Sequence, residues 1–81
     1  MLKEILEVRD GFDEGSMITP KNDYEVQLYK DINLNVKYKP ITLKKGDELE
    51  VQTKTPRESI VKFNDKFFMI FKEDYSQFKE L

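Results

Sequence analysis

The strongest structural signal in this chain is the segment IVKFNDKFFMIF, residues 60–71. Two apolar arms, rich in residues that favour strands, flank Asn64 and Asp65, and both of these residues tolerate the left-handed backbone of a two-residue hairpin turn. A turn at this point fixes which residues face each other across the hairpin. The predicted cross-strand pairs are Phe63 with Lys66, Lys62 with Phe67, Val61 with Phe68 and Ile60 with Met69.

The predicted hairpin is apolar on both of its faces. The face that includes Val61 and Phe68 is continuous, and the opposite face has apolar residues on both sides of Lys62, namely Ile60, Phe67, Met69 and Phe71. A solvated antiparallel sheet usually has one apolar and one polar face, so the second face needs a cover. Either residues 1–9 or the segment 24–30 packs over it, or a partner protein or a second copy of the chain does.

Alternation of apolar and polar residues predicts further strands upstream of this hairpin. Over residues 24–38 the apolar side chains fall on even-numbered positions, which predicts one long bent strand or a hairpin that turns near Lys30 and Asp31. In ITLKKGDELEV, residues 41–51, the alternation resumes on both sides of a turn at Gly46 and the aspartate that follows it.

The two ends of the chain are less regular. Residues 1–9 fit either a short helix or a strand, and residues 10–23 are expected to form a loop, because Gly, Pro and Asn-Asp signals interrupt them. The acidic residues of this loop lack the alternating oxygen ligands of an EF-hand calcium site. The last ten residues, KEDYSQFKEL, predict one short helical turn before a final strand or a free end.

These patterns together predict a single all-β domain over residues 1–81. Five or six short strands, with turn signals at residues 46–47, 55–57 and 64–65, are typical of a small barrel or sandwich. The predicted fold class also allows a short N-terminal helix or 3₁₀ turn. Eighty-one residues are enough for one domain with an economical core.

Residues 41–78 resemble the Src-homology-3 (SH3) family of small barrels. In that family an apolar-Thr/Ser-apolar-Lys-Lys-Gly-Asp segment leaves a diverging turn and enters the second long strand, and residues 41–47, ITLKKGD, are similar. The family then has a hairpin with a tight Asn turn, which residues 61–66 resemble. A 3₁₀ turn with an Asn-Tyr or similar pair precedes its last strand, about where Asp74 and Tyr75 stand here. The resemblance implies an SH3-like barrel.

The resemblance does not extend to the family's peptide groove. That groove uses aromatic residues on a long loop before the diverging turn, but here Tyr38 runs almost directly into Ile41, so the loop is expected to be missing. The groove's tryptophan would fall near Ser59, and the proline before the final turn is replaced near Phe71. Recognition of Pro-rich peptides needs an aromatic-lined groove, so the resemblance implies the barrel and not the ligand. Tyr38 and Tyr75 alone stand in for groove aromatics.

The composition excludes most catalytic chemistry. The chain has no histidine, no cysteine and no tryptophan. A Ser-His or Cys-His nucleophile pair, a thiolate metal site and a disulfide are therefore excluded. No Gly-rich phosphate loop is present, and the carboxylate pairs have no predicted cleft of defined separation. We expect no enzyme, no cofactor and no metal site.

The charge is unevenly distributed along the chain. The net charge is −2, but residues 36–66 carry eight Lys/Arg against five Asp/Glu, a local excess of three positive charges. Such an excess is a modest basic patch, and the interspersed acids weaken its field. The candidate nucleic-acid contacts in this segment are Lys37, Lys39, Lys44, Lys45, Lys54, Arg57, Lys62 and Lys66.

The sequence predicts a cytoplasmic location and no membrane partner. No apolar run approaches the roughly 20 residues that span a bilayer. The start of the chain carries acids among its apolar residues, unlike a signal peptide. Lysine greatly outnumbers arginine and alanine is absent, a usage that often accompanies AT-rich genomes such as those of low-GC bacteria and their phages.

The leading functional hypothesis is a non-enzymatic protein-binding module, such as a small bacterial or phage accessory or inhibitor protein. Its expected contacts are the outward apolar side chains of the 60–71 hairpin and two tyrosines, namely Ile60, Phe67, Met69, Phe71, Tyr38 and Tyr75. One alternative is a nucleic-acid-binding barrel that uses the basic residues of the 36–66 segment. Another is a structural domain that associates with itself, for example as a dimer.

Overall fold

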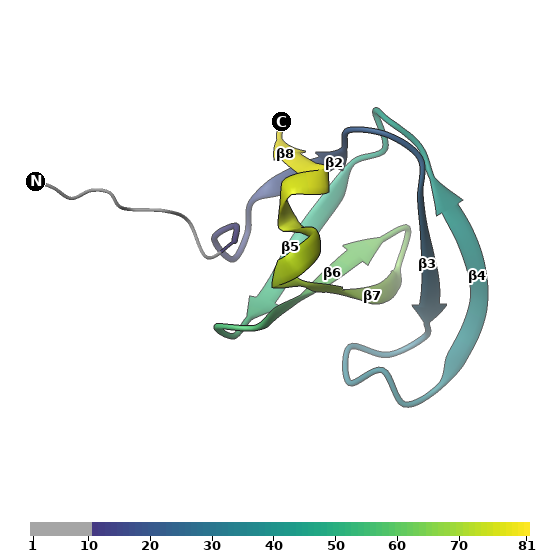
Figure 1. Cartoon of the computed structure of the whole chain (residues 1–81). Coiled ribbons are helices and arrows are strands. Elements are labelled where there is room, and N and C mark those ends of the chain that lie inside the picture. The colour runs from purple at the N-terminus through teal and green to yellow at the C-terminus, as the bar shows by residue number, and fades with distance from the viewer. Residues whose placement is uncertain (1–10) are drawn as a thin grey trace, which may run out of the picture.

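Seven strands and one short 3₁₀ helix form the part of the chain that the computed structural model describes, residues 11–81. The strands are β2 (Met17–Pro20), β3 (Tyr24–Tyr29), β4 (Lys37–Leu43), β5 (Leu49–Lys54), β6 (Glu58–Phe63), β7 (Lys66–Phe71) and β8 (Phe78–Glu80), and the 3₁₀ helix is η1 (Lys72–Gln77). Every pairing is antiparallel, in the order β4-β3-β7-β6-β5-β2-β8. The sheet curls into a half-barrel (Figure 1). The predicted all-β class is confirmed, with seven strands in place of five or six.

The β6–β7 hairpin has the predicted turn and the predicted register. All four of the cross-strand pairs expected from the sequence are present. Asn64 and Asp65 take φ angles of 50° and 64°, the left-handed region that a type I′ turn requires at both central residues. The period of two then places Val61, Phe68 and Ile70 on the face that becomes fully buried.

The inner face of the sheet holds the hydrophobic core. All seven strands and η1 contribute to it through Ile18, Val26, Leu28, Leu43, Leu49, Val51, Val61, Phe68, Ile70, Tyr75 and Phe78. The rings of Tyr24 and Phe78 meet edge to face at one end of the core, with their centroids 4.8 Å apart. Because successive strand residues point to opposite faces, one curled sheet can enclose its own core while its other face stays outside.

Residues 24–43 form a hairpin, which was one of the two arrangements left open by the sequence. β3 and β4 pair from Tyr24 opposite Leu43 to Tyr29 opposite Lys37, and residues 30–36 connect them. The whole β3–β4 hairpin therefore precedes the turn that follows Leu43. The apolar alternation of the sequence runs on through the connecting loop and so conceals the end of β3.

The KKGD turn joins β4 to β5. The backbone amide of Asp47 donates to the carbonyl of Lys44 at 2.9 Å, and the amide of Lys44 donates to the Asp47 carboxylate at 2.8 Å. Gly46 takes a φ of 100° and donates its amide to the buried hydroxyl of Thr19 at 2.8 Å. The residues of this turn are thus used to change the direction of the chain.

The predicted loop at residues 10–23 contains a strand. β2 lies between β5 and β8, and Ile18 pairs with Leu49 on one side and with Glu80 on the other. Ile18 and Thr19 are buried, although four residues are too few to show a clear alternation of apolar and polar side chains. The turn signals that suggested a loop stand at the ends of this short strand, and pairing on both sides stabilises it.

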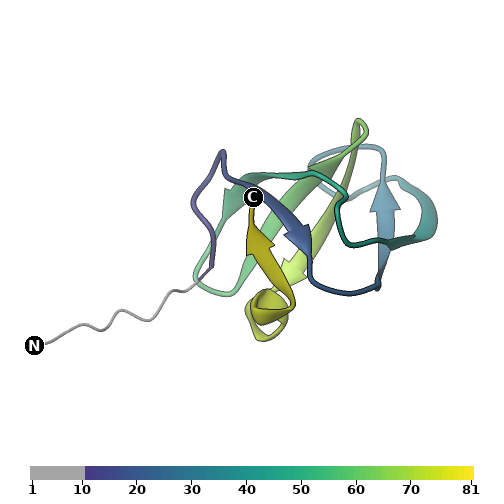
Figure 2. The same cartoon turned by 90° about the horizontal axis from the view of Figure 1, so that it is seen from above.

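The chain ends as predicted, with a short helical turn and a final strand. η1 leads directly into β8, which lies beside β2 (Figure 2). The amide of Leu81 continues this pairing by donating to the carbonyl of Met17 at 2.9 Å. The alternatives for residues 1–9 lie outside the described residues. Within residues 11–81, no helix has the length and apolar character needed to cross a membrane.

Candidate interaction surface

The outer face of the β6–β7 hairpin carries four of the predicted contact residues. Ile60, Phe67 and Met69 are half-buried on this face, whereas Phe71 is 51% exposed. Met69 lies directly opposite Ile60, and Glu58 lies opposite Phe71. Cross-strand neighbours on one face have Cβ atoms about 5 Å apart, so these side chains form a contiguous strip. We call this strip, with Phe71 at its exposed end, the outer strip.

The predicted cover of the outer strip by segment 24–30 is wrong. β3 continues the sheet beyond β7, with Tyr29 paired opposite Phe67. A strand that lies beside β7 in the same sheet does not pack over the face of that sheet. Tyr29 instead extends the outer strip sideways, because directly opposed residues point to the same face. The other predicted cover, residues 1–9, lies outside the described part of the chain.

A hollow of about 420 Å³ adjoins the exposed end of the outer strip. It lies between the β5–β6 connection and the start of η1, and its walls are Arg57, Glu58, Phe71, Lys72 and Glu73. The amide of Lys72 donates to the carbonyl of Arg57 at 2.9 Å and so ties the two walls together. Among residues 11–81, no ion pair involves any of the four charged side chains of this hollow.

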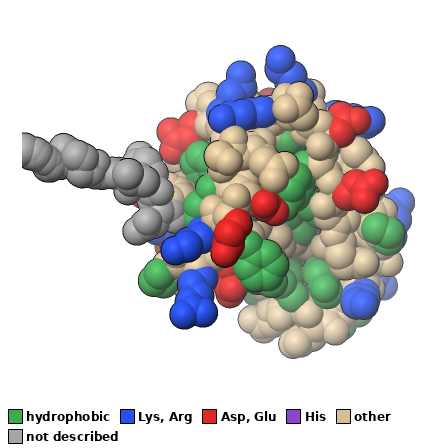
Figure 3. Space-filling view, viewed as in Figure 1, with side chains coloured by type: hydrophobic (Ala, Val, Ile, Leu, Met, Phe, Trp, Pro, Cys, Tyr) green, Lys and Arg blue, Asp and Glu red, His purple; other side chains and the backbone are tan. Residues whose placement is uncertain are grey.

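Acidic and basic side chains are interspersed over the face of the molecule in Figure 3, with hydrophobic side chains between them. Neither sign of charge dominates this view.

Tyr75 lies in the core and is not available on the surface. It is 9% exposed, and its hydroxyl forms a hydrogen bond of 2.9 Å with the hydroxyl of the buried Ser59. Its ring packs near that of Phe12, with centroids 6.0 Å apart, and against Gly11. The prediction that Tyr75 contacts a partner is therefore corrected, because its position after the first turn of η1 directs the ring inward.

Tyr38 is exposed, but it lies near the start of β7, whereas Phe71 lies at the end of that strand. It is 45% exposed, and the ammonium groups of Lys39 and Lys66 lie 5.4 and 4.7 Å from the centroid of its ring. Lys66 begins β7 and Phe71 ends it. The structure therefore separates the predicted protein contacts into an outer strip and a distinct cluster around Tyr38.

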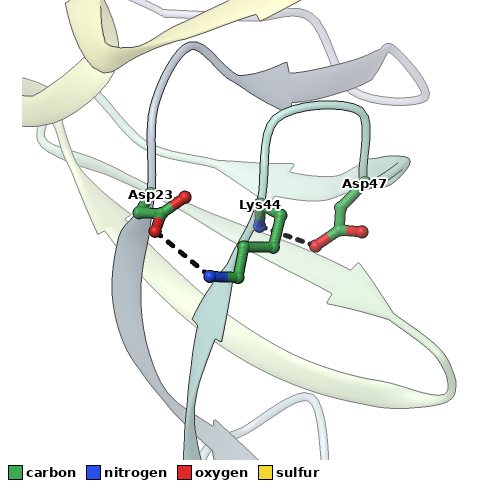
Figure 4. A network of polar contacts seen from close by, with 3 residues as sticks. All are labelled: Asp23, Lys44 and Asp47. Carbon is green, nitrogen blue, oxygen red and sulfur yellow. Dashed lines mark hydrogen bonds and ion pairs between the residues drawn. The ribbon is translucent and has the colours of Figure 1, made fainter.

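The eight predicted nucleic-acid contacts do not form one basic groove. Three of them have acidic partners: Lys44 with Asp23 at 3.1 Å, Lys54 with Asp13 at 3.7 Å, and Lys62 with Asp65 at 3.8 Å. Figure 4 shows the first of these pairs beside the KKGD turn, where Asp47 also accepts from the Lys44 amide. Lys45 lies in the same turn, and Arg57 lies in the wall of the hollow. The other three, Lys37, Lys39 and Lys66, lie at or near Tyr38.

Two exposed apolar residues were not predicted to be surface residues. Ile32 and Val36 are 40% and 51% exposed in the loop between β3 and β4. Their alternating spacing is typical of a half-buried strand and was interpreted in that way. The polar residues that alternate with them indicate a loop more clearly, since Asp31, Asn33 and Asn35 are residue types that favour turns.

One tyrosine has a shifted pKa. The hydroxyl of Tyr24 donates to the Asp74 carboxylate at 2.6 Å and so joins β3 to η1. Burial, and then this hydrogen bond and the negative charge of Asp74, raise the pKa of Tyr24 well above its usual value. A phenol held in its neutral form is a hydrogen-bond donor that stabilises the fold.

Among residues 11–81 no group of acidic side chains is arranged to hold a metal ion. Comparison of the chain with protein-family models, with curated proteins and with solved structures found no match.

Proposed function

We propose that this protein is a non-enzymatic protein-binding module and that its contact surface is the outer strip together with the adjoining hollow. The observation that carries the proposal is the exposure of Phe71 beside four charged side chains that form no ion pair within residues 11–81. Burying a phenylalanine side chain contributes about 1.5–3 kcal/mol, enough for a central anchor. The charges of Arg57, Glu58, Lys72 and Glu73 would form a polar rim that selects partners with complementary charges.

We also propose that the half-barrel is a variant of the SH3-like architecture. Three features support this: the KKGD turn before a long strand, the hairpin with a tight Asn-Asp turn, and a 3₁₀ helix before the last strand. The β3–β4 hairpin occupies the place in the chain of that family's long loop. Ser59, near the position of the groove tryptophan, is buried, and Phe71 replaces the groove proline. The partner is therefore expected to differ from the Pro-rich peptides of that family.

The test is a comparison of Phe71→Ser with Leu81→Ser. Leu81 is 63% exposed at the end of the chain, so its replacement also removes an exposed apolar side chain and serves as the matched control. Tagged wild-type protein should capture a specific host protein, and the purified pair should bind in calorimetry. We expect the Kd to rise by about tenfold or more in Phe71→Ser and to be unchanged in Leu81→Ser.

Two results would contradict this proposal. One is a captured protein that binds the two variants equally well, since the anchor would then be irrelevant. The other is a wild-type dimer in sedimentation that Met69→Asp converts to a folded monomer, with no other protein captured. That result would favour the self-association alternative. Far-ultraviolet circular dichroism of each variant shows whether the fold is retained.

A further inference from the structure

Exposed apolar side chains gather at the end of the β3–β4 hairpin. Six large apolar residues are exposed in the described chain, and three of them lie here: Ile32, Val36 and Tyr38. This end of the hairpin lies at the bottom of Figure 1, on the other side of the molecule from the C-terminus. We define residues 30–39 as the docking loop.

The docking loop is held in one shape by its own hydrogen bonds. The amide of Lys30 donates to the carbonyl of Val36 at 2.8 Å, and the amide of Leu34 donates to the carbonyl of Asp31 at 3.0 Å. The Asp31 carboxylate accepts from the amides of Asn35 and Val36, both at 2.9 Å. A loop fixed in this way loses little conformational entropy when it binds, so its exposed side chains are preorganised for contact.

Positive charge surrounds the exposed apolar residues. The lysines at or beside the docking loop are Lys30, Lys37, Lys39 and Lys66, and none of them forms an ion pair with a residue in 11–81. The only acid of the loop, Asp31, is half-buried, and its carboxylate is bonded to the backbone. The loop therefore combines a net positive charge with exposed apolar side chains, in a chain whose net charge is −2.

We propose that the docking loop binds to an anionic lipid surface. Aliphatic side chains at a loop tip can enter the interface between headgroups and acyl chains, and lysines beside them can reach the lipid phosphates. Tyrosine is a residue type that favours this interface. A nucleic acid would account for the lysines and for Tyr38 as a stacking platform, but not for Ile32 and Val36. Surface docking needs no membrane-spanning segment, so the absence of a long apolar run does not bear on it.

Vesicle co-sedimentation of the whole protein tests this proposal. Wild type should bind vesicles of phosphatidylcholine mixed with phosphatidylglycerol, should bind phosphatidylcholine alone much more weakly, and should be released by salt. The double variant Ile32→Ser/Val36→Ser should lower the partition coefficient by about tenfold or more. Lys37→Gln/Lys39→Gln should lower it by about fivefold for each lysine. Leu81→Ser, which also removes an exposed apolar side chain, is the control and should bind as wild type does.

Three results would overturn the proposal. The first is no binding to the anionic vesicles at low salt. The second is full binding by the folded Ile32→Ser/Val36→Ser variant, because charge alone would then explain the association. The third is stronger binding of a single-stranded oligonucleotide that depends on Lys37 and Lys39 but not on Ile32 and Val36. None of these results bears on the partner-binding role of Phe71, because that role is measured with a different variant and a different ligand.

Discussion

At the scale of single residues, Gly11 is a position where even a methyl side chain is expected to lower the stability of the fold. Its φ is 130°, and a Cβ atom built on it would overlap the ring of Tyr75 at Cε2. That ring cannot easily move, because its hydroxyl is bonded to Ser59. We predict that Gly11→Ala lowers the free energy of unfolding by about 2–4 kcal/mol, the sum of backbone strain and overpacking.

Urea denaturation of Gly11→Ala and Gly15→Ala separates these two terms. Gly15 also has a positive φ, 88°, but a Cβ atom there would have no neighbour within 4 Å. The control variant should therefore lose only the backbone term, about 1–2 kcal/mol. Equal losses in the two variants would mean that the contact with Tyr75 is not responsible.

Tyr24 gives the molecule a pH dependence in the alkaline range. Its pKa is raised in the folded state, first by burial and then by Asp74, so above the ordinary tyrosine pKa of about 10 the folded state holds this proton more tightly than the unfolded state. This contribution to stability is fully present below about pH 10 and is lost as the pH rises toward the folded pKa. The free energy of unfolding of the wild type should therefore fall above pH 10.

Tyr24→Phe tests this linkage. At neutral pH the variant loses a hydrogen bond to a charged acceptor and should be less stable by about 1.5–3 kcal/mol. Above pH 10 the difference from wild type should shrink, since the variant lacks the titrating phenol. Denaturation curves at several pH values measure both effects, with Tyr38→Phe as an exposed control. A difference that stays constant with pH would refute the assignment.

At the scale of elements, the turn of the β6–β7 hairpin requires a left-handed backbone at Asp65. Asp65 has a φ of 64°, and its ion pair with Lys62 is long and exposed, at 3.8 Å. Glycine takes this backbone region without strain, whereas alanine does not. We predict that Asp65→Gly is more stable than Asp65→Ala by about 1 kcal/mol in thermal or urea denaturation. Both variants lack the carboxylate, so equal stabilities would show that the left-handed backbone is not limiting.

Elements with strong local signals were predicted and the others were not. The β6–β7 hairpin follows from residues 60–71 alone, because turn chemistry and alternation agree there. β2 could not be predicted, because its four residues are strand only through their pairing with β5 and β8. The loop between β3 and β4 was hidden by apolar alternation, since a pattern of period two cannot show whether its apolar side chains are buried.

At the scale of the whole molecule, the curl of the sheet decides which candidate residues act together. The outer strip was predicted from the sequence, and its four apolar residues do share one face. Tyr75 was also predicted to be a contact residue, but η1 directs it into the core. Tyr38 and the lysines nearest to it lie at the opposite end of β7 from Phe71, so the candidate residues fall on two separate surfaces.

The all-β class, the register of the β6–β7 hairpin and the absence of histidine and cysteine chemistry follow from the amino-acid sequence alone. These conclusions depend on residue type and on local spacing, and both can be read directly from the sequence. Only the tertiary structure decided that Ser59 and Tyr75 are buried, that Phe71 borders a hollow, and that Ile32 and Val36 are exposed. Exposure depends on which distant strands meet, and in a curled sheet that is set by pairings such as Tyr29 with Phe67 that no local pattern contains.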